Sequence, residues 1–247
     1  MRNWLVVDAR WGRTGAPLWS APVIAFWTLI GLAGVAAVVD WVAVARGDDR
    51  LEYVAKPAVL ALLTAAAAVI PEAHTDLVDR RWWFVAALAF CLLGDVLLML
   101  PRDLFVPGLA AFLLGHVLFI VGLLQPPSPA GSPPFAFSPT GLAVACAVAV
   151  AYGAVPAVLI FRALSGDDYR GLIPPVAVYL VAILTMAVLA ANVGVPAAAI
   201  GAVLFVVSDT VLALDRFVRP VRHGQVVIHV TYHLAQVLLV LSLVHGT

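Results

Sequence analysis

Long apolar runs recur along this chain of 247 residues, and their length constrains the fold more than any other feature. A helix needs about 20 apolar residues to cross the hydrocarbon core of a bilayer. We predict eight such spans, at residues 21–45, 57–71, 82–100, 105–124, 140–161, 172–192, 196–215 and 226–245. The runs lack the period-two alternation of a membrane β-barrel. The predicted fold class is therefore an all-α integral membrane protein, a single bundle of about eight transmembrane helices.

Composition excludes several other classes of protein. Hydrophobic residues make up 64% of the chain and charged residues 11%, which is too apolar for a soluble globular domain. The formal net charge is zero and there is no basic tail or patch, so no nucleic-acid partner is expected. Cys91 and Cys146 both fall inside predicted spans and indicate neither a disulfide framework nor a zinc site.

The chain divides into a short leading segment and one membrane domain. Residues 1–20 are predicted to be a tail or to lie at the membrane interface, and residues 21–245 form the transmembrane domain. A loop rich in proline, serine and glycine, at 125–139, separates two four-span halves that we expect to be related. In each half an aspartate is followed by a histidine in the next span, Asp95 by His116 and Asp209 by His233. This pattern favours a parallel repeat about an axis along the membrane normal.

Two acidic residues, Asp95 and Asp209, lie inside apolar spans. A carboxylate at bilayer depth costs roughly 2.5–3.5 kcal/mol on insertion scales, so such residues usually have a function. Each lies about six residues from the end of its span, roughly 9 Å below the same membrane face. The alternative is that both are packing residues, hydrogen-bonded within the bundle. We expect spans three and seven to touch and to bring the two carboxyl groups into one water-accessible hollow, where they would act as catalytic acid and base. Which one is the acid is not predicted.

Other polar residues of the spans are candidates for binding a substrate beside this pair. They are Lys56, His116, Tyr179, Tyr232, His233 and Gln236. Each also has a structural alternative: a lysine at the start of a span can extend to the interface, and a histidine, tyrosine or glutamine can hydrogen-bond between helices. At the mouth of a polar pocket, Lys56 could equally hold a phosphate headgroup.

A metal site is a weaker alternative. His229 and His233 are four residues apart on one helical face and could bind a metal with Asp209, but they lack the glutamate of a zinc-protease motif. We therefore predict no metal. No cofactor is expected either, because a pair of carboxyl groups can carry out acid–base catalysis without one. Asp40 and Asp215 lie near span ends, where we expect ordinary solvated carboxylates.

The loop charges suggest an orientation in the membrane. The face nearest the acidic pair carries Arg46, Arg50, Lys56, Arg102, Arg162, Arg170, Arg216, Arg219 and Arg222. The positive-inside rule then favours a cytoplasmic location for this face, in a bacterial-type cell membrane. Three arginines in residues 1–20 favour the opposite orientation.

Five motifs occur in order along the membrane region: Lys56-Pro57, Gly94-Asp95, and the runs FVPGLAAFLLGH at 105–116, LFVVSDTVLALDRF at 204–217 and TYHLAQ at 231–236. Together they resemble the YhhN-like lysoplasmalogenase family. The resemblance implies an eight-span hydrolase that cleaves the vinyl ether bond of lysoplasmalogens, releasing a fatty aldehyde and a glycerophospho-base. It also implies that Asp95, Asp209 and Lys56 occupy the family's motif positions and that the partner is a lysophospholipid in the membrane.

Two rival functions are compatible with the same residues. A small transporter or lipid flippase would also use parallel repeats and a proton-linked carboxyl pair. A structural or assembly subunit would tolerate replacement of both aspartates.

The aspartate pair can hydrolyse a vinyl ether by protonating its β-carbon and assisting the attack of water, much as paired carboxyls act in glycosidases.

Overall fold

The computed structural model describes residues 20–70, 78–125, 146, 154–166 and 169–244. Within these ranges it contains helices and no strand. The long helices are α1 (Ala21–Arg46), α2 (Asp49–Val69), α3 (Val78–Met99), α4 (Phe105–Leu124), α6 (Ile173–Asn192), α7 (Pro196–Ala213) and α8 (Gly224–Leu241). Shorter elements are an apolar helix at Ala154–Leu164, a 3-10 turn η2 (Arg170–Leu172) and a π-helical turn η3 (Leu214–Val218) that continues α7.

Seven of the described helices are long and apolar enough to cross a membrane, which confirms the all-α bundle of a multi-pass integral membrane protein. The fifth predicted span, 140–161, lies mostly outside the described residues. Its last residues, 154–161, belong to the helix Ala154–Leu164. The predicted segment 1–20 and loop 125–139 also lie almost wholly outside them. The relation between two four-span halves stays a prediction.

The predicted start of the second span was wrong. We expected this span to begin beside Lys56 and Pro57, but α2 begins at Asp49, so both residues lie inside the helix. The side chain of Asp48 accepts a hydrogen bond from the Leu51 backbone N–H and caps the helix. The first two turns of α2 contain charged residues, so they do not belong to an apolar run and were not predicted as part of the span. Charged residues are compatible with a helix that extends beyond the hydrocarbon core.

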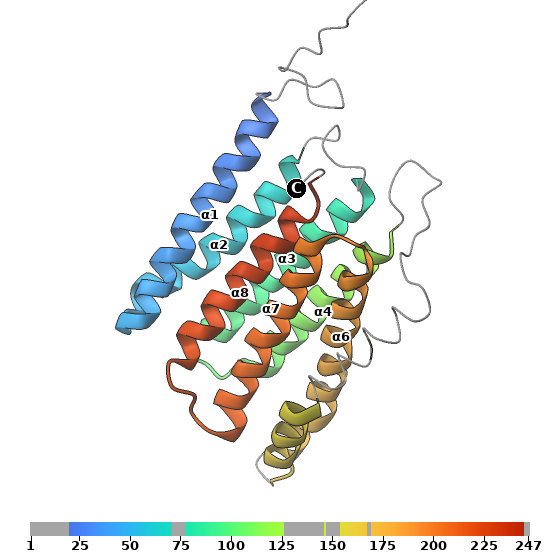
Figure 1. The fold of residues 1–247 in the computed structure, drawn as a ribbon. Coiled ribbons are helices and arrows are strands. Elements are labelled where there is room, and N and C mark those ends of the chain that lie inside the picture. Colours follow the sequence, from blue (N-terminus) through green and yellow to red (C-terminus); the bar gives the residue numbers. More distant parts are fainter. Residues whose placement is uncertain (1–19, 71–77, 126–145, 147–153, 167–168, 245–247) are drawn as a thin grey trace, which may run out of the picture.

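The described helices form a closed ring in which most neighbours are also consecutive in sequence. Helices α1 to α4 pack in order, α4 packs on α6, α6 on α7 and α7 on α8, and α8 contacts α1 and α2 to close the ring. The α1–α2, α3–α4 and α7–α8 turns lie at one end, at the bottom of Figure 1, and the last residues of α8 lie at the other. Spans three and seven were expected to touch. Instead, α3 and α7 are not among the closely packed helix pairs and face each other across the ring.

Small residues allow the close approach of neighbouring helices. A Cβ atom on Gly115 of α4 would lie 2.9 Å from the Cys91 Sγ and 3.2 Å from the Ala87 carbonyl oxygen of α3, so only glycine fits there. At the α1–α2 turn, Gly47 adopts a φ of 68°, and its N–H bonds the carbonyls that end α1. This turn directs α2 back along α1 and brings its first residues to the end of the ring that holds the site.

Candidate active site

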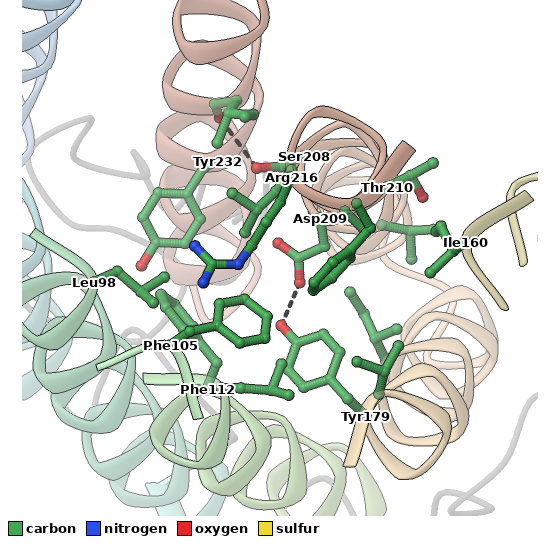
Figure 2. Close-up of a pocket in the computed structure, with 18 of the residues that line it drawn as sticks. Leu98, Phe105, Phe112, Ile160, Tyr179, Ser208, Asp209, Thr210, Arg216 and Tyr232 are labelled. Carbon is green, nitrogen blue, oxygen red and sulfur yellow. Dashed lines mark hydrogen bonds between the residues drawn. The ribbon is translucent and has the colours of Figure 1, made fainter. Parts of the chain in front are cut away.

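A cavity of about 300 Å³ lies inside the ring, toward the end that carries the α1–α2, α3–α4 and α7–α8 turns. Residues of every long helix except α1 line it, together with residues of the short helix Ala154–Leu164 and of η3. Both predicted acids, Asp95 and Asp209, are among them (Figure 2 shows Asp209). The two carboxyl groups therefore share one cavity although their helices do not pack along each other.

Asp95 is held by two side chains, one from α2 and one from α8. It is 2% exposed on α3. The Nζ of Lys56 on α2 lies 3.5 Å from its Oδ1, and the hydroxyl of Tyr232 on α8 donates a hydrogen bond of 2.8 Å to its Oδ2. A buried carboxylate persists only where such partners replace water. Lys56 is the single lysine of the chain and is itself buried, so the two charges neutralise each other inside the protein.

Asp209 has a different set of partners. The hydroxyl of Tyr179 on α6 donates a hydrogen bond to its Oδ2, as Figure 2 shows. The neighbouring Ser208 donates to the Ile228 carbonyl oxygen at 3.1 Å and so joins α7 to α8. In the described residues no ion pair reaches Asp209. Both acids thus accept a hydrogen bond from a tyrosine, and of the two only Asp95 also faces an ammonium group among the described residues.

The cavity is polar in the middle and apolar at its inner end. Tyr179 and Tyr232 stand with the two acids, and α6 continues inward with Ile183 and Leu184 on the lining. Val206 on α7 faces the same region. Because α6 rises about 1.5 Å per residue, these apolar side chains lie roughly one turn deeper in the membrane than Tyr179. The cavity can therefore accept a molecule with a polar end and an apolar chain.

Three of the predicted binding residues line the cavity, and three lie behind it. Lys56, Tyr179 and Tyr232 form part of the lining, whereas His116, His233 and Gln236 do not. His116 is fully buried: its Nδ1 lies 2.7 Å from the Phe112 carbonyl oxygen, and its ring packs edge-on against that of Tyr179. The Nδ1 of His233 accepts a hydrogen bond of 3.1 Å from the Trp41 indole, and Gln236 is fully buried one turn from Tyr232. These three residues lie behind the residues that line the cavity and support them.

Sequence reasoning missed a buried pair next to the cavity. Asp40 was expected to be solvated, but it is fully buried on α1, and its Oδ2 accepts a 2.7 Å hydrogen bond from Nδ1 of His229. His229 lines the cavity, with its Nε2 3.8 Å from Oε1 of Glu52. The depth criterion that selected Asp95 would also have found Asp40, which lies seven residues before the Gly47 turn. The expectation failed because the orientation of α1 places this residue against α8.

The alternative metal ligands are not assembled. His229 is bonded to Asp40 instead of Asp209, and no group of three or more histidine, cysteine or acidic residues suited to a metal occurs in the part of the chain that the structure describes. Asp215 is partly exposed and accepts hydrogen bonds from the Val221 N–H and the Gln225 amide. It therefore orders the α7–α8 turn.

Comparison with known proteins identifies the family. The model of the YhhN family matches residues 51–243, most of the membrane domain. The chain belongs to the YhhN family. It is similar to a protein of Mycobacterium bovis named lysoplasmalogenase, 33% identical over 83% of this chain and 79% of that protein. It is also similar to the human protein named lysoplasmalogenase TMEM86B, 34% identical over 63% of this chain and 61% of that protein. No solved structure matches the chain.

Proposed function

We propose that this protein is an integral-membrane hydrolase that cleaves the vinyl ether bond of lysoplasmalogens, or of a related lysophospholipid ether, to a fatty aldehyde and a glycerophospho-base. The observation that carries the proposal is the presence of Asp95 and Asp209 on the lining of one cavity. Relatives named lysoplasmalogenase, at 33% and 34% identity, support the class of enzyme.

The reaction requires an acid, a negative charge and a water molecule. Protonation of the β-carbon of the vinyl ether gives an oxocarbenium ion, in which the positive charge is shared between the α-carbon and the ether oxygen. Water adds to the α-carbon and loses a proton, which forms a hemiacetal. The hemiacetal then divides into the aldehyde and the alcohol of the glycerol backbone. One proton enters and one leaves, so no cofactor is consumed.

The partners of the two acids suggest their roles. We assign the proton donor to Asp209, because a neutral acid is compatible with its neutral phenol partner, Tyr179. We assign the negative charge to Asp95, because the Lys56 ammonium group 3.5 Å away favours a carboxylate there. The Asp95 carboxylate would then stabilise the oxocarbenium ion and accept the proton of the attacking water. A positioned acid or base contributes roughly 10²–10⁴-fold to such a reaction.

The depth of the lining residues supports a lipid substrate. The acids lie near the middle of the cavity, and the apolar end formed by Ile183 and Leu184 is deeper in the bundle. A lysoplasmalogen has its vinyl ether between a glycerophosphate headgroup and an apolar chain. With the chain in the inner part, the reacting bond would lie level with Asp95 and Asp209.

The test is aldehyde release from choline and ethanolamine lysoplasmalogens by the purified protein in detergent micelles, with the ester analogues side by side. We expect the wild type to release aldehyde, and Asp95→Asn and Asp209→Asn each to lose at least a hundredfold in kcat. Asp49→Asn, at an exposed position in the first turn of α2, is the control and should retain full activity. Elution as a folded monodisperse species should be the same for all variants. Near-normal turnover in either cavity variant would remove that aspartate from the mechanism.

The same assay separates hydrolysis from transport. A transporter or flippase acts between two compartments and would release no aldehyde in micelles, where no gradient exists. A structural subunit would also release none. Absence of aldehyde from every vinyl ether tested would therefore end the hydrolase proposal.

The proposal includes the orientation of the cavity toward the cytoplasm. Arginines of the described turns, among them Arg46, Arg102 and Arg222, lie at the end of the ring that holds the cavity. The last described helix, α8, ends at the opposite end. Alkaline phosphatase fused to the C-terminus should then be exported and active in a bacterial host. If that phosphatase is inactive, and a separate fusion of green fluorescent protein to the C-terminus is fluorescent, the cavity faces the other side of the membrane.

A further inference from the structure

Arg216 lies at the outer end of the same cavity and has no role in the reaction described above. It belongs to η3, the π-helical turn that continues α7, and it lines the cavity. Figure 2 shows its side chain extending over Phe105. The centre of its guanidinium group is 4.2 Å from the centre of the Phe105 ring, and its Nη2 donates a 3.0 Å hydrogen bond to Oδ1 of Asp103.

Arg216 is the more accessible of the two fixed positive charges on the described lining. The other, Lys56, is buried and paired with Asp95. The Arg216 side chain is 37% exposed, and that of its partner Asp103 is 78% exposed. An ion pair between such exposed side chains contributes about 0–1 kcal/mol, so a better anion can displace Asp103 at little cost.

The geometry of Arg216 suits a phosphate group. A guanidinium group is planar and can donate two parallel hydrogen bonds to phosphate oxygens. The Phe105 ring lies directly against the guanidinium group and limits its movement. The site is therefore partly organised before a ligand binds, which lowers the entropy lost on binding.

Its position along α7 agrees with the layout of a lysophospholipid. Arg216 follows Asp209 by seven residues, which is roughly 10 Å along a helix and toward the membrane surface. In the substrate, the three-carbon glycerol backbone separates the ether oxygen from the phosphate in the same direction. An anion at Arg216 and a vinyl ether at Asp209 can thus belong to one molecule.

We propose that Arg216 binds the phosphate of the lysophospholipid headgroup in place of Asp103, with the Phe105 ring holding its guanidinium group in position. The proposal rests on the hydrolase function for the identity of the ligand. It moves the phosphate site from Lys56, where the sequence suggested it, to the outer end of the cavity, because Lys56 neutralises a catalytic carboxylate instead.

The test compares two substrates with the same vinyl ether: choline lysoplasmalogen, and the 1-alkenylglycerol that lacks the phosphate. In Arg216→Gln, the ratio of kcat/KM for the first substrate over the second should fall at least tenfold, mainly through KM of the lysoplasmalogen. Arg216→Lys should recover part of the ratio, because it keeps the charge without the planar pair of donors. Arg219→Gln, at an exposed position just after η3, is the matched control and should leave the ratio unchanged.

A binding measurement keeps this proposal separate from hydrolysis. Lysophosphatidylcholine and monoacylglycerol, which contain no vinyl ether, are titrated against wild type and Arg216→Gln in the same detergent. The variant should lose at least tenfold in affinity for the first and little for the second, and inorganic phosphate should weaken binding of lysophosphatidylcholine to the wild type alone. Phosphate-dependent binding without aldehyde release would contradict the hydrolase function and support the phosphate site at Arg216. Equal effects on both ligands, or no effect on either, in a variant with wild-type thermal stability would overturn the phosphate site.

Discussion

Replacing Lys56 by methionine is expected to destabilise the protein through Asp95. The side chain of methionine has a similar length, so the change removes the charge and little of the volume. The Nζ–Oδ1 distance of 3.5 Å corresponds to an attraction of about 5 kcal/mol at an effective dielectric constant of about 20. The hydrogen bond from Tyr232 remains and stabilises the carboxylate in part. We therefore expect a loss of about 3 kcal/mol in the free energy of unfolding, at the lower end of values for a broken buried ion pair.

The assay is unfolding by titration with SDS from detergent micelles, followed by circular dichroism and tryptophan fluorescence. The double variant Lys56→Met/Asp95→Asn removes both charges and keeps a hydrogen-bond acceptor for Tyr232. It should recover at least about 2 kcal/mol of the loss, because no uncompensated charge is left inside the protein. Arg50→Met, which removes an exposed charge from the first turn of the same helix, should change stability by less than about 0.5 kcal/mol.

Two results would refute this reasoning. If Lys56→Met is as stable as the wild type, the lysine and the aspartate do not stabilise each other as charges. If the single and double variants are equally unstable, the loss comes from packing around position 56, and the ion pair contributes nothing measurable.

Three further predictions concern single contacts. Gly201→Ala should lower the free energy of unfolding by about 1–3 kcal/mol, because its Cβ would lie 3.0 Å from a backbone oxygen of α8. Gly34→Ala, which has open space around it, is the control and should not destabilise the protein in the same SDS titration. Asp40→Ala should cost about 3 kcal/mol by leaving His229 without its buried acceptor, and a stability equal to the wild type would contradict that contact. Tyr179→Phe should lower kcat for aldehyde release about tenfold or more with little change in KM, since it removes the hydrogen bond to the proposed acid; an unchanged kcat would count against that role.

Several features of this protein follow from sequence alone, because the bilayer acts on each helix separately. Its thickness requires about 20 apolar residues per span, so the runs indicate the helices and their order. The fixed rise of a helix then places Asp95 and Asp209 at one depth, and both do line the same cavity. The motifs around them are sufficient to indicate the family.

The neighbours of each helix, and the face it turns inward, were decided only by the tertiary structure. Lipid tails are as apolar as leucine, so hydropathy carries no information about which side of a span meets protein. That is why α3 and α7 were expected to touch although they lie across the ring, and why Asp40 was expected to be solvated although it is bonded to His229. The pairing of Lys56 with Asp95 and the position of Arg216 over Phe105 depend in the same way on packing between segments distant in sequence.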